Sequence, residues 1–437
     1  MANPEIGLLS LLAILLLIFA GLWVPFALML VSYLGVWAIK GSPLLASKLL
    51  ALTAADSLSN YFFSVVPLFI LMGYVVSATG LARDAFDIAQ LVFRRCRGGL
   101  GVATVGANAV FSAVTGISIA AAAVFTQIAV PEMVRHGYTT RFSVGVVAGS
   151  SVLGMLIPPS LLLILYGLLT EQSIGDLFIA GIVPGLLLAL VFALGVVFMT
   201  ICFPAFTGSG SMKSPIDPEP LSTGFIIIRL APICSVVVVV FGGIYSGFFT
   251  PTEAGAVGCL VSLIIGALRK RLSWQDIKSV LRDTGLVTAS VCFLIISAQM
   301  YSRMLSLSGL PAEIGNFLTS SGLSYWSTIV AYIGVLILLG AILDSASIML
   351  IMVPLMLPMM LGLDVNLIWF GIVTVLAVEI GLLTPPFGLA VFVIKNTLQD
   401  PSISLADIFW GAAPFALLML FVLFLIIAMP WLVTGML

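Results

Sequence analysis

The sequence predicts an all-α polytopic membrane protein, and three observations carry this prediction. Of the 437 residues, 61% are hydrophobic and only 8% are charged, whereas soluble domains carry about 25% charged residues. The mean hydropathy is +1.27, and several apolar stretches reach the roughly 20 residues that cross a bilayer as a helix. The chain lacks the alternating pattern of transmembrane β-barrel strands. Its net charge of −1 also argues against nucleic-acid binding.

Residues that usually carry enzymatic chemistry are scarce. The five cysteines form no Cys-x-x-Cys pair, so neither a metal cage nor a thiol redox pair is predicted. The single histidine, His136, is expected in a loop. Zinc-protease, nucleotide-binding and dinucleotide-binding motifs are absent. We therefore expect no catalytic residue, no cofactor and no enzyme activity, an intramembrane hydrolase included. Active transport would have to draw on an ion gradient or on another subunit.

Apolar segments place the membrane spans along the chain. The N-terminal run is expected to form a broken pair of helices within residues 6–39 rather than a cleaved signal peptide, because no positively charged region precedes it. An amphipathic segment at 81–93 is expected to lie along the membrane interface. Spans are predicted at about 62–79, 143–168, 178–202, 225–248, 251–268, 284–303, 366–394 and 409–434.

Several motifs recur in order at a nearly constant offset, which indicates an internal duplication. Gly154-Met-Leu-Ile-Pro158-Pro159 returns as Gly381-Leu-Leu-Thr-Pro385-Pro386. Near the start of each half, Gly21-Leu-Trp-Val-Pro25 resembles Gly247-Phe-Phe-Thr-Pro251.

A segment rich in glycine, serine and proline, 204–224, lies between the two halves and is expected to be an exposed connecting loop. We therefore predict a first repeat over residues 1–203 and a second repeat over 225–437, which ends with the helix at about 409–434.

The basic residues predict how the halves are oriented. The loops around 94–97 and 269–282 are expected on the cytoplasmic side. With both loops inside, the spans at 143–168 and 366–394 run in opposite directions, which is an inverted repeat. Lys40 and Lys48 then fall outside, against the positive-inside rule.

Residues 99–130 and 326–360 fit no simple span. Each segment is apolar and breaks at its middle with small and polar residues, at Ser112–Ser118 and at Leu343–Ser347. Half of either segment is about 16 residues, which as a helix reaches ~24 Å, short of a full crossing. We therefore predict two re-entrant hairpins with tips near mid-membrane, and one long tilted helix is the alternative for each. An irregular tip inside the bilayer must be enclosed by protein or line a wet cavity.

Each of the two Pro-Pro motifs falls inside a predicted span. Proline removes an N–H group and clashes with the preceding turn, so a double proline interrupts the helix. We predict broken helices at about 143–168 and 366–394, whose freed carbonyls could bind a cation and whose exposed N-termini could bind an anion. A kink that only aids packing is the alternative.

These motifs resemble those of a known family. Gly154-Met-Leu-Ile-Pro-Pro-Ser160, Gly247-Phe-Phe-Thr-Pro-Thr-Glu-Ala254 and Glu379-Ile-Gly-Leu-Leu-Thr-Pro-Pro386 look like the large membrane subunit (DctM type) of tripartite ATP-independent periplasmic (TRAP) transporters. The resemblance covers essentially the whole chain. It implies a sodium-driven, elevator-type importer of organic acids in the bacterial inner membrane, with a scaffold and a transport domain. It also implies two partners, a small membrane subunit of four helices and a soluble periplasmic solute-binding protein.

We therefore expect sodium-gradient-driven uptake of a small carboxylate that a periplasmic binding protein delivers. A stand-alone sodium/carboxylate symporter of the divalent-anion type is the alternative, because it shares paired hairpins and broken helices. The two differ in whether transport requires a binding protein.

The coupling sodium ions and the substrate are expected between the hairpin tips and the helix breaks. Sodium is a hard cation that prefers oxygen ligands. One region joins the first tip to the first break, the other joins the second tip to the second break, and the substrate carboxylate would lie between the tips. The candidate residues are Ser112, Thr115, Gly116, Ser118, Gly154 and Pro158 in the first region, and Asp344, Ser345, Ser347, Gly381, Thr384 and Pro385 in the second.

Several of these residues have an alternative role. Serine and threonine hydroxyls in membrane helices commonly bond the preceding turn, and Asp344 could cap the second arm of its hairpin. A sodium ion would otherwise be its partner, because a charge at the bilayer centre costs about 2.5–3.5 kcal/mol. Arg303 could assist the substrate carboxylate or snorkel to the interface, and Glu253 is expected to be a helix-start charge.

Overall fold

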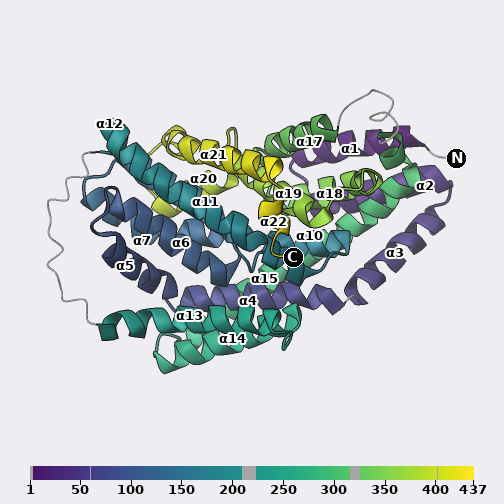
Figure 1. Cartoon of the computed structure of the whole chain (residues 1–437). Coiled ribbons are helices and arrows are strands. Elements are labelled where there is room, and N and C mark those ends of the chain that lie inside the picture. Colours follow the sequence, from purple (N-terminus) through teal and green to yellow (C-terminus); the bar gives the residue numbers. More distant parts are fainter. Residues whose placement is uncertain (1–2, 60, 209–222, 315–324, 401) are drawn as a thin grey trace.

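The computed structural model describes residues 3–59, 61–208, 223–314, 325–400 and 402–437, and within them it contains helices and no strand (Figure 1). Seven helical segments in this part of the chain are long and apolar enough to cross a membrane. The prediction of an all-α polytopic membrane protein is therefore confirmed.

The N-terminal helices α1 to α4 pack against α15 of the second half. The predicted broken pair within 6–39 is α1 and α2, of 16 and 17 residues, joined by a short turn. Helix α4 meets α5 at a bend of 63°. The bounds are α1 Pro4–Phe19, α2 Val24–Lys40, α3 Pro43–Ser59, the 3₁₀ turn η1 Tyr61–Ser64, α4 Val65–Ala78 and α5 Leu81–Phe93.

Helix α3 was not predicted. It contains alanine, serine, threonine, lysine and aspartate between its leucines, so it offers no apolar run of about 20 residues. Its buried residues are Ala46, Leu50 and Thr53, spaced four and three apart as on one face of a helix.

The first hairpin and the first broken helix follow in the order that the sequence predicts. The hairpin arms pack against each other and against α8, and α11 is a 29-residue span beside them. The bounds are α6 Gly99–Thr115, α7 Ser118–Arg135, α8 Thr140–Ser151, α9 Leu153–Leu156, α10 Leu161–Thr170, α11 Ile174–Cys202 and α12 Pro204–Thr207.

The predicted connecting loop at 204–224 is only partly described. Its first four residues form the short helix α12, and residues 209–222 lie outside the described part of the chain. The boundaries of the two repeats therefore stay a prediction.

The second half also contains a helical hairpin followed by a broken helix, and its relation to the first half as a repeat stays a prediction. Helix α15 is longer than predicted, with 35 residues instead of the expected 284–303. The bounds are α13 Thr223–Tyr245, α14 Pro251–Leu268, α15 Trp274–Ser308, α17 Tyr325–Gly340, α18 Ser345–Gly362, α19 Leu367–Leu382, α20 Leu389–Leu398, α21 Leu405–Ala428 and α22 Trp431–Thr434.

An ion-pair cluster fixes α5 against the start of the second half. The Asp84 carboxylate is 3% exposed, and its Oδ2 lies 2.5 Å from Arg269 Nη1 and 2.7 Å from Arg271 Nη1. Arg229 on α13 contacts both Asp84 and Asp87. The arginines that contact Asp84 balance the charge of its buried carboxylate, which would be costly to bury without a cationic partner.

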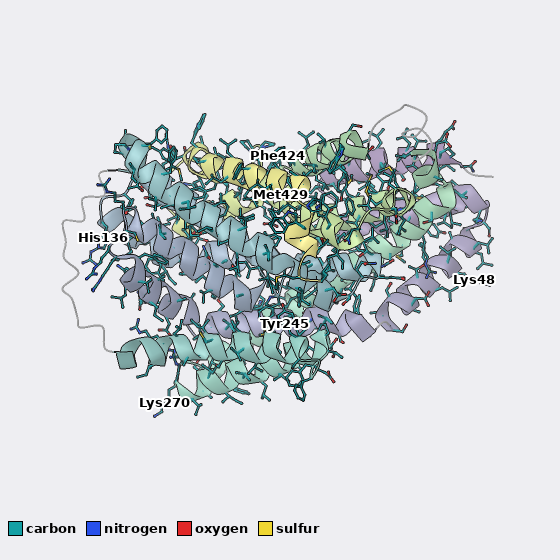
Figure 2. All side chains as sticks on the ribbon, viewed as in Figure 1. Lys48, His136, Tyr245, Lys270, Phe424 and Met429 are labelled. Carbon is teal, nitrogen blue, oxygen red and sulfur yellow. The ribbon has the colours of Figure 1, made fainter. Side chains whose placement is uncertain are left out.

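The two hairpins lie in opposite halves of the molecule. Figure 1 places α6 and α7 on the left and α17 and α18 on the right. His136, which follows α7, and Lys270 lie toward the left end, whereas Lys48 of α3 lies at the right end (Figure 2). The two hairpins therefore approach each other from opposite directions, and residues of both tips line one cavity.

Candidate functional site

Both hairpin tips contribute to one cavity of about 490 Å³. Ile117 comes from the first tip, and Asp344 and Ser345 come from the second. Leu161, the first residue after the break in the first broken helix, also lines it. The structure thus brings together the tips that the sequence predicts in two distant segments.

The first tip is held against the first break by backbone contacts. Gly116 has φ +65°, and its carbonyl accepts a hydrogen bond from the amide of Leu161 at 3.2 Å. A side chain at Gly116 would clash with the Pro159 carbonyl. A Cβ at Gly154 would lie 3.1 Å from the Ser118 amide nitrogen. Glycine at both positions therefore allows the tip and the broken helix to touch.

The side chains at the first tip differ in their partners. The Thr115 hydroxyl donates to the Phe111 carbonyl at 3.0 Å, which is the alternative that the sequence left open. The Ser112 hydroxyl is buried and has no hydrogen-bond partner among the residues that the structure describes. Ser118 is buried and begins α7. Pro158 and Pro159 form the break, and their peptide bond is cis.

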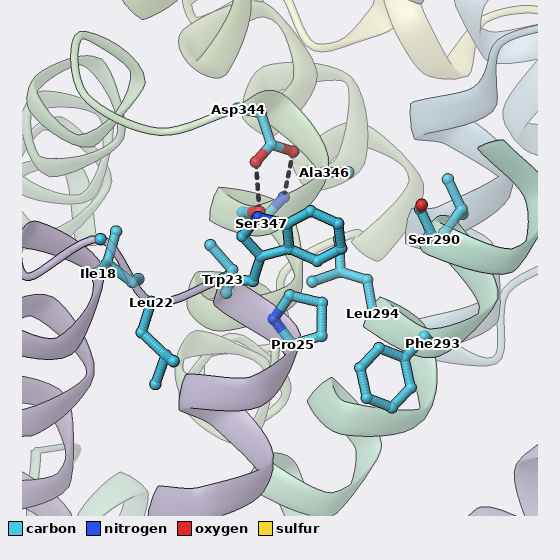
Figure 3. Close-up of a pocket in the computed structure, with 13 residues that line it drawn as sticks. Ile18, Leu22, Trp23, Pro25, Ser290, Phe293, Leu294, Asp344, Ala346 and Ser347 are labelled. Carbon is cyan, nitrogen blue, oxygen red and sulfur yellow. Dashed lines mark hydrogen bonds between the residues drawn. The ribbon is translucent and has the colours of Figure 1, made fainter. Parts of the chain in front are cut away.

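The second tip is ordered by Asp344, which is the N-cap of α18. Its Oδ2 accepts a hydrogen bond from the Ser347 amide at 3.0 Å, and the Ser347 hydroxyl donates to Oδ1, as the dashed lines in Figure 3 show. The capping alternative for Asp344 is therefore the geometry that the structure has. Its role in binding a cation stays a prediction.

The second break contacts its tip in the same manner as the first. The Phe387 amide, just after Pro385 and Pro386, donates to the Ala341 carbonyl at 3.0 Å. A Cβ at Gly381 would clash with Gly340 on α17, so these two helices meet through their glycines. The peptide bond between the two prolines is cis.

Thr384 repeats the pattern of Thr115. Its hydroxyl donates to the Gly381 carbonyl at 2.7 Å, within the same turn. Both threonine hydroxyls are therefore occupied by local bonds. Thr384 and Pro385 line a separate cavity beside α21, whereas Asp344 and Ser345 line the cavity between the tips. The ion-binding role of the candidate residues stays a prediction.

Sequence reasoning treated Glu379 only as part of a motif. Its carboxylate is buried, with 2% of the residue exposed, and accepts a hydrogen bond at 2.8 Å from the hydroxyl of Ser345 at the second tip. A carboxylate in the middle of an apolar span is a signal that could have found it. Asn108 on α6 was also missed, and its amide donates to Ser150 on α8 at 2.6 Å.

Asp344 also lines a second cavity, of about 480 Å³. Its walls include Trp23, which precedes α2, Pro25 in the first turn of α2, and Ser290 and Leu294 from α15 (Figure 3). Asp344 therefore lines two cavities, one shared with the first hairpin and one shared with the N-terminal helices.

Arg303 and Glu253 have structural partners away from the tips. The Arg303 guanidinium donates to Asp56 on α3 at 2.7 Å, and Arg303 does not line the cavity between the tips. Glu253 forms a capping box with Thr250 at the start of α14, as expected for a helix-start charge. His136 caps α7, where its ring nitrogen contacts the Glu132 carbonyl at 2.8 Å.

Comparisons with known proteins agree with this architecture. The family model of the DctM component of the tripartite ATP-independent periplasmic transporter matches residues 11–432. The C4-dicarboxylate TRAP transporter large permease protein DctM of Pseudomonas aeruginosa is 33% identical over 384 residues, which cover 87% of each chain. The chain belongs to the DctM family.

Other DctM-family relatives carry other substrates in their names. The sialic acid TRAP transporter large permease protein SiaM of Vibrio cholerae is 29% identical, over 95% of this chain and 94% of its own. The ectoine TRAP transporter large permease protein TeaC of Halomonas elongata is 30% identical, over 84% and 83%. This DctM-family protein is therefore a multi-pass membrane protein and a TRAP large permease, and its relatives are permeases rather than enzymes.

Two solved transporters share the fold at low identity. The YdaH transporter of Alcanivorax borkumensis has a TM-score of 0.64 at 13% identity and covers 89% of this chain and 90% of its own. MtrF of Neisseria gonorrhoeae has a TM-score of 0.63 at 13% identity and covers 98% and 95%. These similarities concern the fold of the DctM-family chain alone.

Proposed function

We propose that this protein drives the uptake of a small organic acid across the bacterial inner membrane with a sodium gradient. The observation that carries the proposal is the cavity between the tips, which residues of both hairpins and the first helix break line together. Broken helices and re-entrant tips are the features with which secondary transporters bind ions and substrate near the middle of the membrane.

Sodium is proposed to bind where each tip meets its break. The second region offers the Asp344 carboxylate and the Ser345 hydroxyl, which are oxygen ligands that a hard cation prefers. The first region offers the buried Ser112 hydroxyl, which lacks a partner among the described residues. A bound cation would also balance the Asp344 charge inside the membrane.

The substrate carboxylate is proposed to bind in the cavity between the tips. Three helices start at its wall, because Ala120, Leu162 and Ala346 in the first turns of α7, α10 and α18 line it. Helix N-termini carry partial positive charge, so they favour an anion. Because the Asp344 carboxylate caps α18, the starts of α7 and α10 are proposed to hold the substrate carboxylate.

Transport is further proposed to require two partners and an elevator motion. Relatives that match most of this chain are named as large permeases of TRAP transporters. A small membrane subunit and a periplasmic binding protein would supply the remaining parts. The hairpins and broken helices, related as an inverted repeat, would move together against a scaffold that includes α13, α14 and α15.

Uptake in proteoliposomes tests the proposal. The chain is reconstituted alone or with a small membrane subunit and a binding protein, and labelled organic acids are added with an inward sodium gradient. We expect uptake only with both partners and with sodium. Strong uptake by the chain alone would instead support a stand-alone sodium/carboxylate symporter, and uptake that ignores sodium would contradict the coupling.

A further inference from the structure

The walls of the cavity between the tips are mostly apolar. The larger hydrophobic side chains belong to Ile117, Ile119, Val124, Met155, Leu161, Leu162, Val287 and Val291. Tyr74, Ser77 and Ser345 are the neighbouring residues with hydroxyl groups. A ligand that fills this space therefore exchanges water for hydrocarbon contacts over most of its surface.

The charge of the cavity is also unusual for an anion site. Among the described residues that line it, Asp344 carries a charge and none is lysine or arginine. Arg303 is paired with Asp56 instead. The positive potential at the wall therefore comes from the N-termini of α7 and α10, because the Asp344 carboxylate already offsets that of α18. The two sodium ions proposed at the two tips would balance Asp344 and one substrate carboxylate.

These two properties select among organic acids. One carboxylate can lie at the helix N-termini, and the rest of the ligand then meets apolar side chains. A second carboxylate on the substrate would be transferred from water into the cavity with no further cation to pair with it. This transfer is costly in an apolar cavity. A sugar acid would bury several hydroxyls against mostly apolar walls, where Tyr74, Ser77 and Ser345 could bond to only a few of them.

We propose that the substrate is a small monocarboxylate with an apolar body. This inference rests on the proposed function, because it places the substrate in the cavity between the tips. Each methylene transferred from water to an apolar wall is worth about a fourfold gain in affinity. We therefore expect 4-methylpentanoate to bind at least about tenfold more tightly than acetate, and butanoate at least about tenfold more tightly than succinate.

Binding to the purified full chain in detergent measures this preference without the selectivity of a binding protein. Isothermal titration in sodium chloride and in choline chloride compares 4-methylpentanoate, acetate, butanoate, succinate, N-acetylneuraminate and ectoine. Tightest binding of 4-methylpentanoate in sodium supports the proposal. Tighter binding of succinate, of the sugar acid or of the zwitterion ectoine overturns it while leaving sodium-coupled transport intact.

A charge variant tests that the cavity itself sets the preference. Ala123 lines the cavity from α7, so Ala123→Lys introduces the missing cation there. Val134→Lys makes the same change of charge near the end of the same helix, where Val134 is 41% exposed.

We expect Ala123→Lys to shift the ratio of butanoate to succinate affinity toward succinate by at least about tenfold, and Val134→Lys to leave it unchanged. Equal ratios in the parent and in a folded Ala123→Lys variant would overturn the proposal. Absence of sodium-dependent binding of every carboxylate to the parent chain would instead overturn the proposed function and this inference with it.

Discussion

The hydroxyl of Ser345 donates a hydrogen bond to the buried carboxylate of Glu379, 2.8 Å away. Ser345 is the first residue of α18 at the second hairpin tip, whereas Glu379 lies within α19 just before the second break. The bond therefore joins the second hairpin tip to the helix that ends at the second break. Any movement of this tip away from α19 has to break the bond.

Replacement of Glu379 tests this tie. Glu379→Ala removes the acceptor and leaves the Ser345 hydroxyl unpaired, which costs about 1–3 kcal/mol in a buried place. Glu379→Gln keeps an acceptor oxygen, so we expect it to retain most of the stability that Glu379→Ala loses. Thermal unfolding of the purified chain measures the difference. Equal losses in the two variants would show that the charge of Glu379 matters rather than its hydrogen bond.

Asp344→Asn separates the charge of this residue from its capping role. Asparagine is as good an N-cap as aspartate, so α18 should still form and the protein should still insert. The sodium activation curve of transport should shift to higher sodium, because the carboxylate proposed to bind the ion is gone. Asp56→Asn is the matched control, since Asp56 is 61% exposed on its side chain and pairs with Arg303. A curve for Asp344→Asn that overlays that of the parent would assign Asp344 to capping alone.

The close approach of α17 and α19 predicts a glycine-specific loss of stability. A Cβ at Gly340 would lie 2.7 Å from the Gly381 Cα, so Gly340→Ala must push the helices apart. Such overpacking costs about 1–3 kcal/mol. Gly334 lies on the same helix with open space around it, and Gly334→Ala should be close to neutral. The melting temperatures of the two variants check this, and equal melting temperatures would contradict the close approach.

The tips and breaks could be predicted from sequence because they depend on local chemistry. Gly116 and the two Pro-Pro pairs interrupt the apolar runs where a helix must end, and the structure ends helices there. The start of α14 is equally local, since Thr250 and Glu253 form a capping box within four residues.

The remaining features depend on contacts that no local pattern specifies. The Ser345–Glu379 bond joins residues 34 positions apart, and the Asn108–Ser150 bond joins residues 42 positions apart. The early start of α15 was missed because its first turns are polar, and Ser273 caps them with Asp276. Hydropathy reports the membrane-crossing part of such a helix and not its extension into water.

The last prediction concerns the relation between the two hairpins. Ser118 begins α7 and Ser345 begins α18, so each marks the tip of one hairpin, and both residues are buried. If the halves form an inverted repeat, a cysteine at one tip should become reachable from one side of the membrane and a cysteine at the other tip from the opposite side.

The test uses Ser118→Cys and Ser345→Cys in a background without the five native cysteines, treated with an impermeant maleimide from each side, with and without sodium. We expect labelling of the two positions from opposite sides, because the hairpins lie in opposite halves of the molecule (Figure 1). Labelling of both positions only from the same side under every condition would contradict the inverted repeat, whereas Val134→Cys, exposed near the end of α7, should be labelled from its own side throughout.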